Sequence, residues 1–567
     1  MSKILANYLK ATIEGLKDAG VKDIVLSPGS RSTPLAILFE QDPELRIFMD
    51  VDERSAAFFA LGLSKATQRA VACVCTSGTA AANYFPAVCE AMESQIPLII
   101  LTTDRPSELR YSGAPQTMDQ THLYGNKVKF SMEYPLPEDN SNMLQFSYSQ
   151  MFQVVTRSLS IPMGPVHVNF PFREPLIPES NNELPNIKRK VNLSGVKSLL
   201  TLDKDLIQLL KQEKGLFLIG ETPSSIDLDQ LILLSEKLGW PIFSDSLANI
   251  KTSSFKSNTI IDHHDLLLKH VEMVDEKEPT VIVRIGRALL SKTLNTYLSS
   301  YQGDYVLIDE TGLIPDYSHQ VSMVVDVDVN SWLRVANEGV FSKDKSNWLN
   351  MWVTLDEKVQ RLLKSSEAYN KYSELYLTKE ILSSMPDKAQ LFIGNSMPIR
   401  DVDTVLEKSD NESTLFGTRG INGIDGIVSS AFGMAAAKPD VWNGLLIGDI
   451  SFFHSMNGLS LGNNHDLALT LFVINNNGGG IFSMLPQNQL PNDLFERLFG
   501  TPQGIDLEGI AKAFTCEYQR VTNKQEWEKI VDEVMNKPTL RIVELVTSRD
   551  YNKSIRQSLN EMVASQL

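Results

Sequence analysis

Apolar side chains recur along this chain in two alternating patterns. Between residues 4 and 16 they fall three or four positions apart, which indicates one face of an α-helix. A short apolar run at 24–26 follows and ends at Ser27-Pro28-Gly29. Such a run before a Pro-Gly pair is typical of a buried strand that leads into a loop. We therefore expect a helix, then a strand, then a loop.

The same alternation continues through the first third of the chain. Apolar runs at 46–50, 71–75 and 98–102 predict strands, while residues 55–66 and the segment after Thr79 predict helices between them. Helices that separate successive strands are typical of a parallel sheet covered by helices.

Two further series of the same kind follow. The second starts near residue 195, and its expected strands are 216–219, 241–244, 281–285, 305–308 and 323–327. The third follows a helical stretch at 348–363, and its expected strands are 390–393, 444–447, 469–474 and 540–546. Residues 172–190, rich in Pro, Glu, Asn and Lys, are interpreted as a linker. The patterns predict an α/β protein with three doubly wound parallel-sheet domains, at residues 1–178, 195–350 and 365–567.

Length and composition agree with this division and narrow the function. The chain has 567 residues, and domains usually contain about 100–200. With 43% hydrophobic and 22% charged residues, it has the composition of an ordinary globular protein. The formal net charge of −16 argues against binding to nucleic acid or anionic lipid surfaces, because both attract basic proteins. Small-molecule chemistry is the better starting hypothesis.

The sequence also predicts where the protein works. No apolar run approaches the ~20 residues that cross a bilayer, and the N-terminus lacks the apolar core of a signal peptide. The four cysteines, Cys73, Cys75, Cys89 and Cys516, show no C-x-x-C pairing and are expected to be reduced thiols. We therefore expect a cytoplasmic protein with no membrane span.

Two loops of the third series carry candidate ligands for a metal ion and a diphosphate. Gly448-Asp449-Ile450-Ser451 follows one expected strand and Asn475-Asn476-Asn477-Gly478-Gly479 follows the next. Open α/β sheets bind ligands outside the carboxyl ends of their strands. Asp449, Asn476 and the Gly478 carbonyl offer the oxygen ligands that Mg²⁺ prefers, and the glycines let the backbone approach phosphate closely. Taken separately, the two loops are better explained as an ordinary turn and a polar loop.

A carboxylate in the first series is a candidate acid/base. Glu53 follows the expected strand at 46–50 and starts an alanine-rich helix. A glutamate in the loop after a strand can act as a general acid or base on a bound ligand. A glutamate in the first turn of a helix is also ordinary complementation of the helix dipole, and taken alone this second interpretation is preferred.

Taken together, the two loops are similar to the Gly-Asp-Gly…Asn-Asn signature of thiamine-diphosphate enzymes, with Ile450 in place of the last glycine. Further motifs in the first and third series narrow the resemblance. They are Ser27-Pro28-Gly29-Ser30-Arg31-Ser32-Thr33-Pro34, Asp52-Glu53-Arg54-Ser55-Ala56-Ala57, Thr76-Ser77-Gly78-Thr79-Ala80, Asp104-Arg105-Pro106, Gln116, Gly394-Asn395-Ser396, Arg419-Gly420 and Gly423-Ile424-Asp425-Gly426. With them the chain resembles the 2-succinyl-5-enolpyruvyl-6-hydroxy-3-cyclohexene-1-carboxylate synthases of menaquinone biosynthesis, a family of thiamine-diphosphate enzymes.

The resemblance implies thiamine diphosphate as the cofactor, with Mg²⁺, or alternatively Mn²⁺, as its metal ion. It implies a pyrimidine-binding, a central and a diphosphate-binding domain, in a homodimer or homotetramer whose active sites lie between subunits. It places these residues against the coenzyme: Glu53, Ser77, Gly78, Gly394, Ser396, Ile424, Gly448, Asp449, Ile450, Ser451, Asn476, Gly478, Gly479, Ile481 and Phe482. Among them, Glu53 is the implied acid/base, Ile424 supports the coenzyme, and Asp449, Asn476 and Gly478 hold the metal.

The family reaction joins 2-oxoglutarate to isochorismate with release of CO₂, which makes the implied enzyme a transferase of aldehyde or ketone residues. Both substrates are dianions, so a net acidic protein must concentrate arginine locally. The implied substrate-binding residues are Arg31, Arg105, Gln116, Lys292, Arg400, Arg419, Phe482 and Leu485, and the implied catalytic residues are Glu53, Arg31, Gln116, Ser396, Arg400 and Arg419. Arg400 and Arg419 are assigned to the 2-oxo acid, and Arg31, Arg105, Gln116 and Lys292 to isochorismate. Lys292 rests on a weak local pattern and is also explained as a surface lysine. Ile481, Phe482 and Leu485 are expected to form an apolar wall that excludes water.

Other interpretations stay open at this point. Another thiamine-diphosphate enzyme, such as a 2-oxo acid decarboxylase or an acetohydroxyacid synthase, shares the coenzyme motifs. A nicotinamide dehydrogenase is suggested only by the α/β alternation, and no convincing G-x-G-x-x-G follows a strand. A non-catalytic subunit on this fold predicts loss of the glutamate or of a metal ligand, whereas Glu53, Asp449 and Asn476 are all present.

Two groups of charged residues are interpreted as surface features. Asp262-His263-His264 is taken as a polar surface loop, because no other residue suggests a histidine-centred site. Arg54, Arg69 and Arg110 are taken as solvated arginines.

Overall fold

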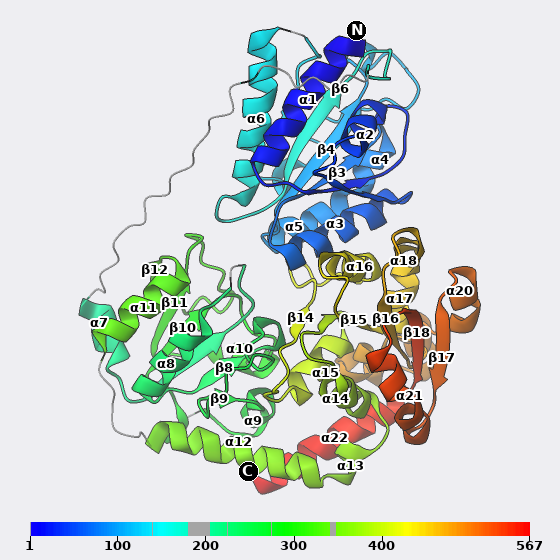
Figure 1. The fold of residues 1–567 in the computed structure, drawn as a ribbon. Helices are drawn as coiled ribbons and strands as arrows, with labels where there is room; N and C mark the ends of the chain where they lie inside the picture. Colours follow the sequence, from blue (N-terminus) through cyan, green and yellow to red (C-terminus); the bar gives the residue numbers. More distant parts are fainter. Residues whose placement is uncertain are drawn as a thin grey trace.

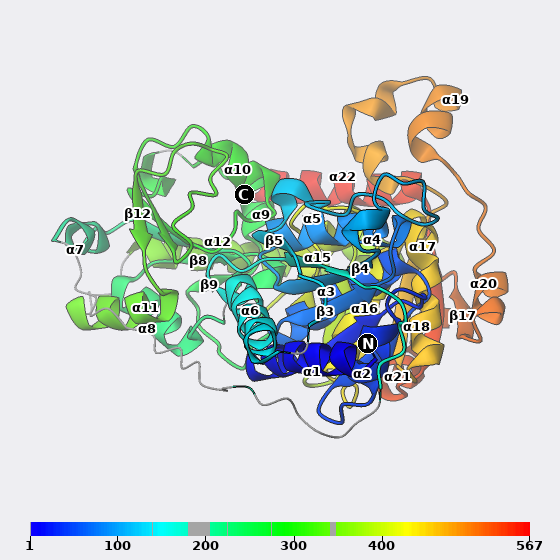
Figure 2. The same ribbon diagram turned by 90° about the horizontal axis from the view of Figure 1, so that it is seen from above.

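The protein contains three parallel β-sheets that follow one another along the chain. A computed structural model describes residues 2–138, 140–179, 187, 204–223, 225–273, 275–340 and 347–567. Each sheet has six strands, and all neighbouring strands run parallel. Figure 1 shows the N-terminal domain above the other two, and Figure 2 shows it lying over the C-terminal domain with the central domain beside it. The predicted α/β class with three parallel-sheet domains is confirmed.

The first sheet has the order β2-β1-β3-β4-β6-β5. Its strands are β1 (Asp23–Leu26), β2 (Arg46–Met49), β3 (Val71–Cys75), β4 (Leu98–Asp104), β5 (Phe130–Glu133) and β6 (Val166–Pro171). Its helices are α1 (Ser2–Asp18), α2 (Thr33–Glu40), α3 (Glu53–Thr67), α4 (Thr79–Asn83), α5 (Phe85–Glu93) and α6 (Ser141–Leu159). The first helix and the strands expected at 24–26, 46–50, 71–75 and 98–102 are all present, whereas β5 and β6 were not predicted.

The last sheet repeats that strand order, as β14-β13-β15-β16-β18-β17. Its strands are β13 (Gln390–Ile393), β14 (Thr414–Phe416), β15 (Asn443–Gly448), β16 (Leu469–Asn475), β17 (Glu517–Val521) and β18 (Leu540–Val546). Its helices are α13 (Glu367–Asn370), α14 (Glu374–Ser384), α15 (Met397–Val405), α16 (Ile427–Ala437), α17 (Asp449–Ser455), α18 (Leu459–Asn464), α19 (Asn492–Phe495), α20 (Leu507–Ala513), α21 (Lys524–Asn536) and α22 (Arg549–Gln566). In this order β13, β15 and β16 are adjacent, and they run parallel. Their carboxyl ends are therefore neighbours at one edge of the sheet.

The central sheet has a different order, β12-β11-β10-β7-β8-β9. Its strands are β7 (Gly215–Ile219), β8 (Ile242–Ser244), β9 (Ile260–Ile261), β10 (Val281–Ile285), β11 (Asp304–Asp309) and β12 (Met323–Asp326). Its helices are α7 (Lys204–Leu210), α8 (Leu228–Leu238), α9 (His264–His270), α10 (Lys292–Leu298) and α11 (Val329–Gly339), followed by α12 (Asn347–Ser365). All five strands predicted for this series are present. Most of the predicted linker beyond residue 179 lies outside the described residues, and the predicted domain limits stay predictions.

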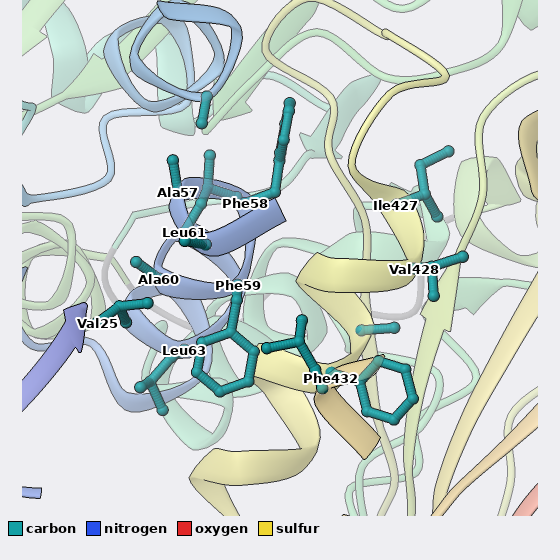
Figure 3. Close-up of a cluster of buried hydrophobic side chains, with 14 of the residues drawn as sticks. Val25, Ala57, Phe58, Phe59, Ala60, Leu61, Leu63, Ile427, Val428 and Phe432 are labelled. Carbon is teal, nitrogen blue, oxygen red and sulfur yellow. The ribbon is translucent and has the colours of Figure 1, made fainter. Parts of the chain in front are cut away.

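The N-terminal and C-terminal domains share one hydrophobic core. It forms where α3 packs against α16, and Figure 3 shows side chains of both helices, among them Phe59 and Phe432, in this cluster. The helices approach closely because each carries a glycine at the crossing. A Cβ on Gly62 would overlap the Ser430 carbonyl oxygen, and one on Gly433 would overlap that of Phe59. The position of α3, and therefore of Glu53 at its first residue, is fixed by this contact.

The central and C-terminal domains are joined by a buried charged cluster. His263 is only 2% exposed, with Nδ1 3.0 Å from Asp356 Oδ1 of α12 and Nε2 3.4 Å from Glu407 Oε1, just after α15. Asp262, also buried, pairs with Lys408 at 3.0 Å. The interpretation of residues 262–264 as a surface loop was wrong, because their partners come from distant parts of the chain.

The hydrophobic side chains of α12 and α22 add to this junction. They form one cluster with buried residues of the central sheet, and Figure 1 shows both helices running along the same side of the molecule. Trp348 and Trp352 of α12 and Ile555 of α22 belong to it. Among the described residues, no helix combines the length and the apolar character that crossing a bilayer requires.

We expect Gly62→Ala to destabilise the protein by about 1–3 kcal/mol, because the added methyl group must push α3 away from the α16 backbone. Chemical denaturation followed by circular dichroism measures the change. The matched control is Gly164→Ala, where the nearest atoms belong to the flexible Lys129 side chain. Equal stability of the two variants would contradict the close helix contact.

His263 should make stability depend on alkaline pH. Burial opposes its charge, but hydrogen bonds to Asp356 and Glu407 outweigh burial and raise the pKa of His263 from 6.5 to about 9. A raised pKa means that the charged pair stabilises the fold fully below pH 6.5 and loses its effect as the pH rises through 9. The loss should be on the order of 3 kcal/mol. Unfolding of wild type and His263→Gln across pH 6–10 measures it, and parallel pH curves for the two proteins would show the prediction to be wrong.

Candidate active site

A cavity of about 360 Å³ lies at the carboxyl ends of β13, β15 and β16. It is lined by the loops after these strands, by the start of α15 and by the 3₁₀ turn η6 (Gly480–Met484). The lining residues are Glu374, Asn395, Ser396, Met397, Pro398, Arg400, Arg419, Asn422, Ile424, Gly448, Asp449, Ile450, Ser451, Ile474, Asn476, Gly478, Gly479, Gly480, Ile481, Phe482 and Leu485. We call it the C-terminal cavity. It contains both loops of the predicted metal and diphosphate site.

Asp449 is the buried acid of this cavity. It is 4% exposed, and its two oxygens accept N–H groups of Ile450, at 2.8 Å, and Gly478, at 2.9 Å. Burial outweighs these hydrogen bonds and raises the pKa of Asp449 from 3.8 to about 6. A buried carboxylate in this state gains from a nearby cation.

The loop after β16 offers two more oxygens beside Asp449. The side-chain oxygen of Asn476 is buried and has no hydrogen-bond partner among the residues that the structure describes. Gly478 has a φ of +144°, and a Cβ there would overlap the Gly500 carbonyl oxygen, so only glycine fits. No group of three or more His, Cys, Asp and Glu side chains suited to a metal occurs in the described parts of the chain. A cation at Asp449 therefore needs amide and carbonyl oxygens, which is the ligand set that Asn476 and Gly478 provide.

Two arginines give the other side of the cavity a positive charge. Arg400 Nη1 donates to the Ser396 carbonyl, and Arg419 Nη1 donates to Asn395 Oδ1 at 2.8 Å. Partial burial and the nearby Arg400 lower the pKa of Arg419. Ser396, between β13 and α15, has a φ of +74°, a conformation that few residues other than glycine adopt. Two like charges in one cavity form a site for an anion with several carboxylates.

The remaining wall is apolar. Ile424, Ile481, Phe482 and Leu485 line the same cavity, and the Phe482 ring lies 5.4 Å from that of Phe499. Gly394, which was also predicted, is at the carboxyl end of β13, where a Cβ would lie 3.2 Å from the Leu446 carbonyl oxygen. It does not line the cavity but lets β13 and β15 pack closely.

The predicted residues of the N-terminal domain form a second polar cluster. Arg105 Nη1 donates to Ser77 Oγ at 2.9 Å and to the Gln116 carbonyl at 2.6 Å, and Gln116 Nε2 donates to the Ser77 carbonyl at 3.1 Å. Arg31 is buried beside them, and burial together with the charge of Arg105 lowers its pKa. Gly78, with a φ of +88°, donates its N–H to Gln120 Oε1 at 2.8 Å. We call Arg31, Ser77, Gly78, Arg105 and Gln116 the N-terminal cluster.

Glu53 belongs to neither group within one chain. It starts α3, is half-buried, and its carboxylate forms no hydrogen bond or ion pair among the described residues. Its neighbours are held by the same chain, because Asn457 donates to Asp52 and the Ser55 and Ser429 hydroxyls lie 2.9 Å apart. Among the described residues, none from the N-terminal domain lines the C-terminal cavity.

Lys292 and Arg110 lie outside both the C-terminal cavity and the N-terminal cluster. Lys292 starts α10 with its side chain exposed and lines neither the C-terminal cavity nor a larger one of about 890 Å³. The larger cavity lies at the ends of β7, β10 and β11 and meets the C-terminal cavity at Arg419 and Asn422. Arg110 was wrongly taken as solvated, because it is mostly buried and pairs with Asp104, at 3.3 Å, and with Glu133.

Three polar residues of the cavity were not predicted from the sequence. Asn395 stood inside a quoted motif but received no role, and Asn422 lies between two motifs. Glu374 follows the helix-capping residue Ser373 and has no motif around it. A buried acid at the start of an amphipathic helix gives no local signal of the loop that it contacts.

Comparison with known proteins agrees with this geometry. Residues 6–123 match the family described as "Thiamine pyrophosphate enzyme, N-terminal TPP binding domain", and residues 408–545 match its "C-terminal TPP binding domain". Residues 186–393 match "Middle domain of thiamine pyrophosphate". The N-terminal cluster thus falls in one matched coenzyme-binding domain, and the metal loops fall in the other.

Similar full-length proteins narrow the family further. A protein of Listeria innocua named 2-succinyl-5-enolpyruvyl-6-hydroxy-3-cyclohexene-1-carboxylate synthase is 41% identical over 575 residues, covering 100% of this chain and 98% of that protein. Proteins of the same name from Enterococcus faecalis and Bacillus cytotoxicus are 40% and 39% identical, each covering 98% of this chain and 96% of theirs. The chain belongs to this family of thiamine-diphosphate synthases. Apart from the one around Glu53, the motifs that this family shares lie in two separate places in the structure, the N-terminal cluster and the C-terminal cavity.

Proposed function

We propose that the protein catalyses the thiamine-diphosphate-dependent decarboxylation of 2-oxoglutarate and the addition of the resulting four-carbon unit to isochorismate, which yields 2-succinyl-5-enolpyruvyl-6-hydroxy-3-cyclohexene-1-carboxylate and CO₂. The observation that carries the proposal is the C-terminal cavity, which is lined by a buried acid, by two arginines, and by Asn476, whose amide oxygen has no hydrogen-bond partner among the described residues. Family membership over the whole chain supports the same reaction.

The coenzyme and its cation fit the residues present. Asp449, the Asn476 side chain and the Gly478 carbonyl are the proposed ligands of Mg²⁺, or alternatively Mn²⁺, which would offset the negative charge of the diphosphate. Gly448, Ile450, Ser451 and Gly479 line the same cavity and let the backbone approach the phosphates. When bound, thiamine diphosphate supplies the electron sink that lets a 2-oxo acid lose CO₂ and react as a carbon nucleophile.

The protein's own side chains bind and orient the substrates. Arg400 and Arg419, with Ser396, are the proposed partners of the 2-oxo acid, because they share the cavity with the metal loops. Arg31, Arg105 and Gln116 are the proposed partners of isochorismate, with Lys292 as a further candidate. Ile424 would support the coenzyme, and Ile481, Phe482 and Leu485 would keep water away from the reacting carbon.

Glu53 is the proposed acid/base, and it requires a second copy of the chain. Its free carboxylate would hold and exchange a proton at the aminopyrimidine of the coenzyme, together with contacts from Ser77 and Gly78. Because α3 is held on α16 of its own chain and no described residue of the N-terminal domain lines the C-terminal cavity, the cavity that Glu53 serves is proposed to belong to a neighbouring subunit. The assembly would be a homodimer or homotetramer, and its cytoplasmic location stays a prediction.

We expect the purified protein to release one CO₂ for each isochorismate consumed, when supplied with thiamine diphosphate, Mg²⁺, 2-oxoglutarate and isochorismate. Mass spectrometry of the product and CO₂ detection measure the outcome. Reactions without isochorismate, and reactions with pyruvate in place of 2-oxoglutarate, are the controls. Equal CO₂ release without isochorismate would favour a simple decarboxylase, and condensation of two pyruvates would favour an acetohydroxyacid synthase; either result would overturn the proposal.

Glu53→Gln and Asp449→Ala should each be nearly inactive alone, yet active together in mixed dimers. A mixed dimer holds one site with both wild-type residues, so dimers purified through a different tag on each chain should show about half of wild-type activity. Folding of each variant is checked by circular dichroism. Mixed dimers as inactive as the parents would show that Glu53 and Asp449 do not serve one site from two subunits.

A further inference from the structure

Glu374 is a buried carboxylate of the C-terminal cavity to which the proposed reaction gives no role. It is the first residue of α14, is 2% exposed, and lines the cavity together with Asp449 and Asn476. Its backbone N–H donates to Asn552 Oδ1 of α22 at 2.9 Å, which fixes the start of α14 against the C-terminal helix. Burial disfavours a charged carboxylate, so a buried glutamate is expected to have hydrogen-bond or ion-pair partners.

Donor groups face both oxygens of Glu374. Oε1 accepts Asn476 Nδ2 at 2.8 Å and the Thr547 hydroxyl at 3.3 Å. Oε2 lies 3.7 Å from Arg556 Nη2, and Arg556 also pairs with the buried Asp401 of α15. The carboxylate is therefore held from the side of the C-terminal helix and in turn holds the loop after β16.

This contact decides which way the Asn476 amide turns. A carboxylate only accepts hydrogen bonds, so the amide nitrogen of Asn476 must face Glu374 and the amide oxygen must face away. That oxygen is the buried one with no hydrogen-bond partner in the part of the chain that the structure describes. In a free asparagine the two orientations differ little, whereas here one of them is selected.

We propose that Glu374 is a positioning residue that orients the Asn476 amide so that its oxygen is available to the divalent cation of the coenzyme. The inference rests on the proposed function, because Asn476 is a proposed ligand there. Partners that orient a metal ligand usually change metal affinity by about 10–100-fold when they are replaced. Arg556 adds to this selection, because its guanidinium group attracts an oxygen atom of residue 374 and repels an NH₂ group at the same place.

Glu374→Gln tests the orientation, because glutamine keeps the size but has one oxygen and one NH₂ group. If its oxygen turns to Arg556, its NH₂ faces the NH₂ of Asn476, and Asn476 must reverse and present nitrogen to the cation. We expect the Kd for Mn²⁺, at a fixed excess of thiamine diphosphate, to rise by about 10–100-fold. Electron paramagnetic resonance of free Mn²⁺ measures it without any turnover.

A control and a rescue variant separate orientation from general damage. Thr547→Val removes only the weaker donor to Oε1 and leaves the contact between Glu374 and Asn476, so its Mn²⁺ affinity should equal that of wild type. In the double variant Glu374→Gln/Asn476→Asp, the aspartate can accept from the glutamine with one oxygen and offer the other to Mn²⁺. Its affinity should return towards that of wild type.

The outcomes distinguish this inference from the proposed function. Wild-type protein that fails to bind Mn²⁺ with thiamine diphosphate would overturn the proposed cofactor site itself. Wild type that binds, together with a folded Glu374→Gln that binds equally well, would overturn only the positioning role. A double variant no better than Glu374→Gln would also overturn it, while loss and rescue in the expected order support it.

Discussion

The parallel pairing of β13, β15 and β16 is the constraint on which the candidate site depends. Since parallel strands point the same way, the loops that follow them meet at one edge of the sheet. Asp449 follows β15 and Gly478 follows β16, and the pairing brings them close enough for a hydrogen bond of 2.9 Å. Asn395 and Ser396, after β13, reach the same cavity from a third strand.

The cavity at this edge of the sheet has an acidic part at Asp449 and a basic part at Arg400 and Arg419. Burial raises the pKa of Asp449, which favours a cation beside it, while burial and the nearby Arg400 lower the pKa of Arg419, which favours an anion beside the two arginines. A cation beside Asp449 and a separate anion beside the arginines can therefore occupy the cavity together. In a chain with a formal net charge of −16, this local grouping of arginines favours an anionic ligand in the cavity, which the overall charge does not.

The contact between α3 and α16 sets a second constraint on the chemistry. It joins the N-terminal and C-terminal domains of one chain through a shared core, and glycines at the crossing leave no room for adjustment. Glu53 is thereby carried on a helix that is locked to its own C-terminal domain, while its carboxylate has no hydrogen bond or ion pair with the residues that the structure describes. Since Glu53 and the C-terminal cavity of the same chain do not meet, this arrangement is consistent with the proposal that two copies of the chain form each site together.

Whether a strand could be predicted from the sequence depended on how buried and how apolar the strand is. Buried inner strands such as β3, β10 and β16 are mostly apolar runs, with isolated polar positions such as Arg284 in β10, and they were predicted almost to the residue. The edge strands β5, β9, β14 and β17 were missed because they are short or half-exposed and lack such a run. The inner strand β6 was missed because the polar residues His167 and Asn169 interrupt it, although both are buried in hydrogen bonds.

The site divides in the same way between sequence and tertiary structure. The alternation of helices and strands and the residue types after each strand can be recognised without a structure, because they are local patterns that a parallel sheet and a bound diphosphate require. The buried ion pair of His263, the contact between Glu374 and Asn476, and the separation of Glu53 from the C-terminal cavity of its own chain become visible only in the folded protein. Each of these depends on contacts between residues far apart in the chain, and such contacts leave no periodic pattern in the sequence.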